Sequence, residues 1–461
     1  MKKAGIMLVI LFVVLSFFSC RNEVDLERNF PTPSTWGELF DIFHSKMSTN
    51  YLFWSLDYNE GRDWDSVYGE YKPLFDELGA IEEGRTEDAQ KANSDKAFEY
   101  FFDILKVLHD GHFAISFNDG NGAEANHYSF SPSTYRILKS LGVSDEDVFE
   151  AFLMTREERE EKYPGYYNLQ KENTANIANY VFDVDISKVN GYQSGINGIG
   201  TYSSSTFSVL NIDGSSPVVG ITGILPNDIA YLSFSGFEFV TNVGTQREAI
   251  ENFLTDFSDN ITTAGIQGVI VDLRGNGGGA TADLKILWPE FFTDDMDSVH
   301  AADTRRKRSE GRTDYTAWVP FEICKDGDRT SNYDNRVPIA VLINENSCSC
   351  AEMSTMLFKA LGNEHGYTVR VFGTNSMGGT GMLYYDDRKE QSEINFNGGI
   401  TKIEPYVDLI YTPFCQLRAY DGVIYEGVGI TPDEIVPFNY DNFTKGTDAR
   451  LDAAIKWLTT I

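Results

Sequence analysis

The stretch VIVDLRGNGGG, residues 269–279, is the part of the sequence that decides the fold. It begins with three apolar β-branched residues, which is typical of a buried strand, and runs through Asp272 and Arg274 into a loop of almost pure glycine. Glycine loses more conformational entropy on folding than any other residue, so a run of glycines weakens the fold. We therefore expect another part of the protein, or a ligand, to approach this backbone closely.

Strands and helices alternate on both sides of this stretch. The hydrophobic patterns predict strands at 228–237, 266–274, 338–344 and 367–373, and helices at 245–257, 280–292 and 350–362, the last one stopping at Gly362. Strands that alternate with helices favour an α/β layer, in which functional sites lie outside the carboxyl ends of the strands.

The chain before this α/β region contains a segment with helical patterns, followed by a segment without a regular pattern. Aromatic and aliphatic residues at helical spacing predict helices within 35–54 and 94–108, each after a capping Ser or Thr, and VLHDGHFAIS (107–116) changes to an extended pattern. The following segment, 118–228, is irregular, with a helical part at 145–163 and a region rich in Gly, Ser and Asn. It contains no persuasive loop for binding a peptide carboxylate.

The first twenty residues have the features of an export signal. MKK is basic, the following run is apolar, and FFSC ends at Cys20. A transmembrane helix needs about 20 apolar residues, and this run is shorter. The pattern resembles a bacterial lipoprotein signal with Cys20 as the lipidated residue, and the alternative is an ordinary cleaved secretory signal. The lipoprotein interpretation predicts a lipid-anchored protein of the cell envelope, in the periplasm or at the outer membrane.

Charge and cysteine content narrow the function further. The 461-residue chain has a formal net charge of −31, which would repel nucleic-acid phosphates and anionic membrane surfaces, so nucleic acid is not expected as a partner. Cys348 and Cys350 are separated by one residue, which suits neither a disulfide nor a zinc site. We expect Cys324, Cys348, Cys350 and Cys415 to be buried or half-buried thiols, and no metal or cofactor is implied.

Two polar turns could carry chemistry. The consecutive N–H groups of RGNGGG could bind an anionic oxygen, either of a phosphate or of a tetrahedral acyl-transfer intermediate. The phosphate motifs of the Walker and dinucleotide loops are not met. In the second turn, Ser349 stands where the strand of 338–344 passes into the next helix, and either Ser347 or Ser349 could simply cap that helix. An exposed hydroxyl at a sharp strand-to-helix turn could also act as a nucleophile.

The combination of VDLRGNGGG with NENSCSCAE about seventy residues later resembles peptidase family S41, the carboxyl-terminal processing and tricorn-like serine peptidases. The resemblance implies a ClpP/crotonase-like α/β core and makes Ser349, three residues before Glu352, the nucleophile. It also implies an oxyanion hole made by the amides of Gly277, Gly278 and Cys350. The processing branch of the family uses a lysine base, but Gly379 occupies that place here.

The tricorn-like branch instead takes a histidine base from an upstream segment. LHDGHFAI resembles its L-x-D-G-H signature, which makes His112 the base and leaves His109 exposed or structural. YEGVGITPDEIV resembles the family's closing element and assigns Glu426 to the charge network behind the histidine. This chain has Gly111 where tricorn has a bridging serine, so three routes stay open: Glu426 reaches His112 in another way, a water intervenes, or Asp110 takes part.

These expectations give one predicted domain organisation, one predicted function and two alternative functions. We expect a signal peptide (1–20), a tether (21–33), an N-terminal helical domain with the histidine (34–117), a middle region that is a divergent PDZ-like domain or an insertion (118–228), and an S41-type catalytic core (229–461). The predicted function is an exported serine endopeptidase acting on peptides or unfolded proteins. The rivals are a non-catalytic module that binds peptides or hydrophobic ligands, and an esterase or amidase. Asp272 and Arg274 are expected to form a local ion pair or to hold the loop.

Overall fold

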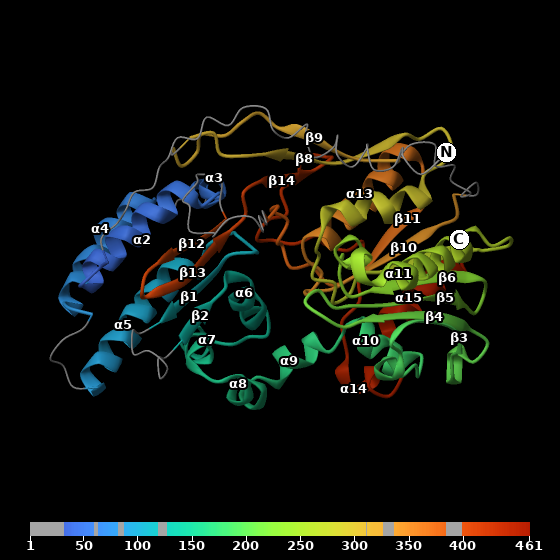
Figure 1. Cartoon of the computed structure of the whole chain (residues 1–461), viewed down its shortest axis with the longest axis horizontal. Coiled ribbons are helices and arrows are strands. Elements are labelled where there is room, and N and C mark those ends of the chain that lie inside the picture. Colours follow the sequence, from blue (N-terminus) through green and yellow to red (C-terminus); the bar gives the residue numbers. More distant parts are fainter. Residues whose placement is uncertain are drawn as a thin grey trace.

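The computed structural model describes residues 32–59, 63–81, 87–118, 127–309, 311–325, 336–383 and 399–461. Figure 1 shows two bodies side by side, one containing the N-terminal helices and the other containing the largest sheet, with a long hairpin running over both. Cys20, the predicted signal peptide and most of the predicted tether lie outside the described residues. Among the described helices, none is long and apolar enough to cross a membrane.

The larger body is built on an eight-stranded mixed sheet of order β15-β11-β10-β7-β6-β5-β4-β3. Its strands are β3 (Gly191–Asn197), β4 (Thr206–Ile212), β5 (Val218–Leu225), β6 (Ile229–Phe234), β7 (Gly268–Asp272), β10 (Ile339–Ile343), β11 (Val369–Gly373) and β15 (Glu434–Ile435). The strands from β6 to β15 are parallel, and the pairs from β3 to β6 are antiparallel. The predicted α/β alternation is confirmed, with four antiparallel strands forming one half of the sheet.

Helices cover both faces of this sheet, which explains why its central strands are apolar throughout. In β7, Val269 and Val271 pack into one core with helices α11 (Phe239–Thr262) and α13 (Cys350–His365), whereas Ile270 faces a second core with α15 (Ala449–Leu458). The remaining helices of this body are α10 (Thr174–Asn176), η2 (Ile177–Val181), η3 (Ile186–Lys188), η4 (Gly200–Tyr202) and α14 (Tyr440–Phe443).

Two of the helices predicted after the glycine-rich loop differ from the structure. The helix expected at 280–292 is three short pieces, η5 (Thr281–Asp283), α12 (Leu284–Leu287) and η6 (Trp288–Phe291), and Pro289 in the last piece cannot donate a helical hydrogen bond. Helix α13 does not stop at Gly362 but continues to His365. It ends at Gly366, whose φ of 73° is the left-handed conformation that glycine adopts at a helix end.

The smaller body packs helices α2 (Trp36–Asn50), α3 (Trp54–Asn59), α4 (Trp64–Leu78) and α5 (Glu87–Leu105) against a four-stranded sheet of order β12-β13-β1-β2. The strands are β1 (Ala114–Asn118), β2 (His127–Phe130), β12 (Gly399–Ile403) and β13 (Val407–Thr412). The predicted cap of the first helix is confirmed, because the Thr35 side chain accepts a hydrogen bond from the Glu38 N–H at 3.1 Å. The core between these elements is largely aromatic.

The segment 118–228 is divided between the two bodies. Strand β2 and helices α6 (Pro132–Ser140) and α7 (Asp145–Leu153) share the core of the smaller body, whereas β3, β4 and β5 extend the large sheet. The helical part predicted at 145–163 is two helices, α7 and α8 (Arg156–Lys162), because Thr155 forms a capping box with Glu158 and starts a new helix. Helix α9 (Pro164–Gln170) then leads to the larger body (Figure 1).

The chain after residue 399 ties the bodies together. Strand β13 pairs with β1, so a C-terminal strand completes the sheet that follows the predicted catalytic histidine. Strand β14 (Gln416–Ala419) joins the hairpin of β8 (Ser298–Arg305) and β9 (Val319–Cys324). Cys348, Cys350 and Cys415 are buried as predicted, but Cys324 is exposed, because it ends β9 on the face opposite the buried Ile323.

Candidate active site

The glycine-rich loop after β7 is packed against the turn that carries Ser349. Gly278 has a φ of 92°, which side chains disfavour, and a Cβ atom on it would lie 2.5 Å from the Ser349 Cβ and 3.0 Å from the Cys350 nitrogen. The Phe237 N–H donates to the Gly278 carbonyl at 2.7 Å, and the Cys348 N–H donates to the Asn276 carbonyl at 3.0 Å. The close approach expected from the glycine run is thus made by the segment of the second polar turn.

Ser349 stands between strand β10 and helix α13 in a strained conformation. Its φ of 55° and ψ of −116° lie outside the regions that L-residues ordinarily adopt. The residue is partly exposed, whereas Ser347 is buried. The Ser347 hydroxyl donates to the Leu273 carbonyl at 2.8 Å and accepts from the Asn344 N–H at 2.9 Å. Ser347 therefore holds the turn, and Ser349 is the serine whose placement suits attack on a substrate.

Of the three predicted oxyanion-hole donors, one is engaged within the loop. The Gly278 N–H donates to the Asn276 side-chain oxygen at 2.9 Å. Gly277 is exposed, and Cys350 is the first residue of helix α13, where backbone N–H groups have no partner inside the helix. Gly277 and Cys350 thus stay as the candidates for binding an oxyanion.

Glu352 connects the Ser349 turn to the loop after β11, a role that the sequence did not suggest. Its buried carboxylate accepts from the Ser349 N–H at 3.1 Å, the Gly379 N–H at 2.9 Å, the Gly378 N–H at 2.8 Å and the Ser376 hydroxyl at 2.5 Å. Burial raises the pKa of Glu352 to about 7, while these donors favour the ionised form. Ser349 precedes Glu352 by three residues, the spacing by which the family resemblance identified the nucleophile. The same spacing lets the Glu352 carboxylate accept a hydrogen bond from the Ser349 N–H.

His112 approaches the same place from the smaller body. Its Nε2 atom lies 3.8 Å from the Cys348 Sγ, and its backbone N–H donates to the Asp110 Oδ1 at 2.9 Å. Its Nδ1 atom is buried and has no hydrogen-bond partner among the described residues. Burial of the ring, which favours the neutral form, lowers the pKa of His112 to about 4.

Gly379 is the point at which the imidazole and the serine turn meet. The Ser349 N–H donates to the Gly379 carbonyl at 3.0 Å. A Cβ atom on Gly379 would lie 2.7 Å from the Cys348 Sγ and 3.3 Å from both Cε1 and Nδ1 of His112. Gly379 stands where the processing branch of the family has its lysine. In this protein the His112 ring packs against that glycine.

Glu426 is buried beside the His112 loop and holds it by the backbone. Its Oε1 accepts from the Gly111 N–H at 2.7 Å. Its Oε2 accepts from the Thr380 N–H at 2.8 Å, the Thr380 hydroxyl at 2.7 Å and the Gly381 N–H at 2.7 Å. Glu426 therefore joins the loops on either side of His112 and makes no hydrogen bond with the imidazole.

Gly111 explains why no serine can bridge here. A Cβ atom at this position would lie 2.2 Å from the Gly378 carbonyl oxygen and 2.5 Å from the Gly379 Cα. Only glycine allows the two loops this contact, which Glu426 then ties together. Gly111, which replaces the serine of the tricorn-like pattern, thus allows the backbone of the His112 loop to contact the backbone at Gly378 and Gly379.

Asp110 adds a second buried carboxyl group. Its Oδ2 accepts from the Thr412 hydroxyl at 2.9 Å, and burial together with the nearby Glu426 raises the pKa of Asp110 well above its usual range. Ligand atoms of Asp110, His112 and Glu426 lie within 4.8 Å of one another. The oxygens of both carboxyl groups already accept hydrogen bonds from N–H and O–H groups. A small cation could bind there only by competing with these hydrogen bonds.

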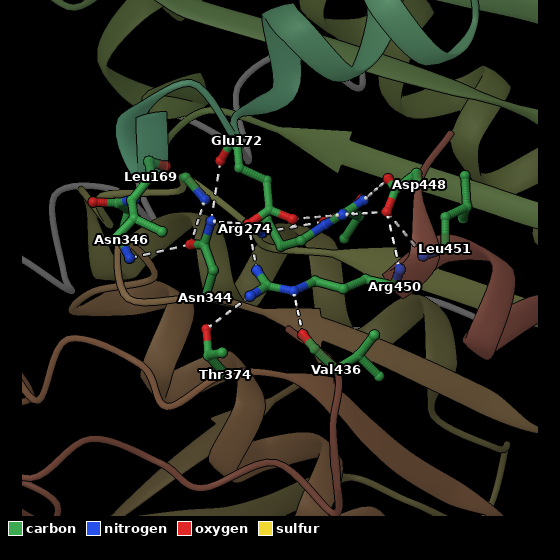
Figure 2. A network of polar contacts seen from close by, with 12 residues as sticks. Leu169, Glu172, Arg274, Asn344, Asn346, Thr374, Val436, Asp448, Arg450 and Leu451 are labelled. Atoms are coloured by element: carbon green, nitrogen blue, oxygen red, sulfur yellow. Dashed lines mark hydrogen bonds and ion pairs between the residues drawn. The ribbon is translucent and has the colours of Figure 1, made fainter. Parts of the chain in front are cut away.

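The other predicted residues serve the framework. The Nδ1 of His109 lies 2.8 Å from the Oδ1 of the buried Asp57, which suits the structural role expected for it. Arg274 forms the expected ion pair with Asp272 at 2.6 Å. It also binds Glu172 and Asp448, neither of which the sequence connected with it. Figure 2 shows Arg274 and Arg450 side by side among these carboxylates, below the segment that contains Leu169 and Glu172.

Comparisons with known proteins match part of the sequence and the overall fold. Residues 228–400 match the model of peptidase family S41, a span that contains the glycine-rich loop and Ser349 but neither His112 nor Glu426. A candidate peptidase from Parabacteroides merdae is similar in structure, with a TM-score of 0.53, 18% sequence identity, and coverage of 92% of this chain and 97% of that chain. Mature CPAF complexed with lactacystin has a TM-score of 0.49 and 11% identity, over 92% of this chain and 97% of that chain. No curated protein matches the sequence.

The S41 match confirms the predicted resemblance, and the first of these structures confirms the fold class, an α/β core with an N-terminal helical region. The family match supports a serine peptidase acting on peptides or proteins.

Proposed function

We propose, on the premise that residues 228–400 form an S41 peptidase domain, that the protein is a serine endopeptidase with Ser349 as nucleophile and His112 as general base. The observation that carries this proposal is the meeting of the Ser349 turn and the His112 ring at Gly379. These segments are more than two hundred residues apart in the chain. A serine needs a neighbouring base to become a nucleophile, and the neutral imidazole is in the protonation state that can accept the proton.

The reaction follows from this arrangement. The Ser349 Oγ forms a bond to the substrate carbonyl carbon as its proton passes to His112, and the carbonyl oxygen becomes an oxyanion facing the N–H groups of Gly277 and Cys350. The carbon–nitrogen bond then breaks, and His112 gives the proton to the leaving amine. Water hydrolyses the acyl-enzyme with His112 again acting as the base. Glu426 acts as a positioning residue that keeps the His112 loop against the loop of Thr380.

Peptide hydrolysis by matched serine variants tests the proposal. We expect Ser349→Ala to lose cleavage of an unstructured peptide by at least about 1,000-fold, since Ser349 is the partly exposed nucleophile of the turn, whereas Ser347, Cys348 and Cys350 are buried. Ser187→Ala, at an exposed serine distant in sequence from the site, should retain full activity. Cleavage of esters but never of peptides by the unaltered protein would favour the esterase, and bound ligand with no turnover of either would favour the non-catalytic module.

We also propose that the protein is exported and anchored by lipid at Cys20. The support is the sequence of the first twenty residues alone, with its basic start, apolar run and terminal cysteine. Expression of the full chain in bacteria fed an alkyne-tagged fatty acid should label the unaltered protein and leave Cys20→Ala unlabelled. An equal signal from both proteins would contradict the anchor.

A further inference from the structure

A cleft of about 630 Å³ lies at the junction of the two bodies. Its floor is formed by strands β1 and β2, where Ala114, Ser116 and Ser129 point away from the aromatic core. Its walls are formed by helices α7, α8 and α9 and by the segment 170–176. The volume is that of an ordinary ligand pocket, large enough for several residues of an extended peptide.

Two segments that line this cleft are joined to the candidate catalytic segments. Ala114 follows His112 by two residues, so the floor continues from the imidazole loop. Asn173, in the second segment, packs on the glycine-rich loop, because a Cβ atom on Gly275 would lie 2.6 Å from the Asn173 Cβ. The cleft therefore lies beside the segments that carry the histidine and the glycine-rich loop.

Hydrogen bonds fix the wall of the cleft to the catalytic turns. The Asn346 side chain donates to the Leu169 carbonyl at 3.1 Å, and the Asn344 side chain donates to the Glu172 carbonyl at 3.1 Å. Figure 2 shows these contacts, with the segment above Asn344 and Asn346. Because Asn344 also accepts from the Gly275 N–H at 3.0 Å, the wall and the glycine-rich loop share one anchor.

The charge of this cleft is opposite to that of the protein. The chain has 69 acidic and 38 basic residues, yet the cleft is lined by Arg156, Arg159 and Lys171 and by no Asp or Glu among the described residues. Arg156 is paired with Glu160. The Nε of Arg159 is buried without a hydrogen-bond partner among the described residues, and Lys171 makes no ion pair with them. A buried guanidinium donor without an acceptor is costly unless a ligand supplies one.

We propose that this cleft binds a carboxylate of the substrate chain through Arg159 and Lys171, and so selects peptides with an acidic group near the scissile bond. This inference rests on the proposed peptidase function and names its substrate class. Guanidinium groups bind carboxylates by paired hydrogen bonds, and Tyr163, Tyr166 and Tyr167 line the same cleft, where aromatic side chains can contact the rest of the peptide. The carboxylate comes either from an acidic side chain or from the peptide's own terminus.

Peptide binding to the full-length Ser349→Ala variant distinguishes an acidic side chain from the peptide's own terminus as the source of the carboxylate. The measurement does not require turnover. The probes are four fluorescein-labelled unstructured peptides, with two central Glu residues or two central Gln residues, each ending in a free acid or an amide. We expect the Glu-containing or the free-acid members to bind about tenfold more tightly than the Gln amide, as one charge-assisted hydrogen-bonded contact would give. Which member gains affinity identifies the source of the carboxylate.

Variants of the two cations complete the test. Arg159→Gln and Lys171→Gln should each remove most of the preference, and both can be checked for folding by their thermal unfolding. Arg247→Gln and Lys188→Gln, at exposed cations on α11 and η3, should keep it. Equal binding of all four peptides, or a preference that survives both cleft variants, would overturn the inference. Discrimination by the Ser349→Ala protein combined with no hydrolysis by the unaltered one would instead overturn the proposed function alone.

Discussion

At the scale of single residues, His112 sets the working range of the proposed enzyme. A base must be neutral to accept the serine proton, and a histidine in water is half protonated near pH 6.5. Here burial disfavours the imidazolium and lowers the pKa of His112 to about 4. The ring is therefore neutral throughout the neutral and mildly acidic range.

The lowered pKa of His112 determines how activity should fall at acidic pH. We expect kcat/KM for peptide cleavage to fall on the acid side with a midpoint below pH 6.5, because the folded protein protonates His112 only near pH 4. The unfolded chain binds this proton near pH 6.5, so the free energy of unfolding should also decrease as the pH falls between these values. A kinetic midpoint at or above pH 6.5 would contradict the buried neutral base.

Removal of the imidazole tests the same residue directly. His112→Ala should lower kcat by about 100-fold to 10,000-fold, the usual contribution of a general base. His365→Ala is the matched control, since that histidine lies at the end of helix α13. Steady-state cleavage of a fluorogenic peptide measures both, and retention of more than a tenth of the activity in His112→Ala would remove this residue from the mechanism.

Glu426 should act on rate through the backbone that it holds. In Glu426→Gln one oxygen is replaced by an NH₂ group that faces N–H donors, so we expect the free energy of unfolding to decrease by about 2–3 kcal/mol. The loosened His112 loop should lower kcat with little change in KM. Urea unfolding and steady-state kinetics measure the two effects, and unchanged kcat would show that Glu426 serves stability alone.

The sequence could predict these residues only in part. Ser349, His112 and Glu426 stand in motifs, and the structure brings their segments together. The hydrogen bonds that join them could not be foreseen, because Glu352 and Asn276 act through the backbone of loops that meet only in three dimensions. Gly278 shows the limit, since its N–H looked free in the sequence and is bound to Asn276.

At the scale of elements, the site depends on two loops whose backbones touch. Gly111→Ala would place a Cβ atom 2.2 Å from the Gly378 carbonyl oxygen, which must push the His112 loop away from the serine turn. We expect this variant to lose at least about 100-fold in kcat/KM, because misplacement of a base by an ångström has effects of that size. The measurement is peptide cleavage alongside circular dichroism of the folded protein.

Gly69→Ala is the matched control for that change. Gly69 lies in the exposed part of helix α4, and no atom lies within 4 Å of a Cβ atom placed there. Alanine should stabilise this helix by about 0.5–1 kcal/mol and leave activity unchanged. Equal activity of Gly111→Ala and Gly69→Ala would show that the contact of the loops is not required.

Local signals predicted the central parallel strands and several of the helices, and they failed where two signals competed. The parallel strands were predicted because their β-branched runs are buried on both faces. The segment 145–163 is rich in helix-forming residues such as Glu, Arg and Lys, but the capping box of Thr155 divided the expected helix. Helix α13 passed Gly362 because packing of its buried face outweighed the low propensity of one glycine.

At the scale of the whole molecule, five buried charged groups join distant parts of the chain. Arg274 of the glycine-rich loop binds Asp272, Glu172 and Asp448, and Arg450 binds Glu172 as well (Figure 2). The network connects the end of β7, the wall of the cleft and the start of α15. The sequence predicted only the local pair of Asp272 and Arg274, because the other members are up to 278 residues apart and pair only after folding.

Loss of the central arginine should therefore affect the entire fold. Arg274→Met leaves three buried carboxylates with one arginine, and we expect the free energy of unfolding to decrease by about 3–5 kcal/mol. Arg247→Met, at an exposed residue of α11, should change it little. Urea unfolding followed by tryptophan fluorescence compares the two, and a change of less than about 1 kcal/mol in Arg274→Met would contradict a structural role.

In the proposed mechanism Ser349 is a nucleophile activated by His112, and covalent labelling of the serine probes both residues in one experiment. The measurement is peptide mapping by mass spectrometry after treatment of the folded protein with a fluorophosphonate. We expect one adduct, on the peptide containing Ser349, and we expect it to form at least about 100-fold more slowly in His112→Ala. Labelling of a different serine, or labelling of Ser349 at the same rate without His112, would contradict it.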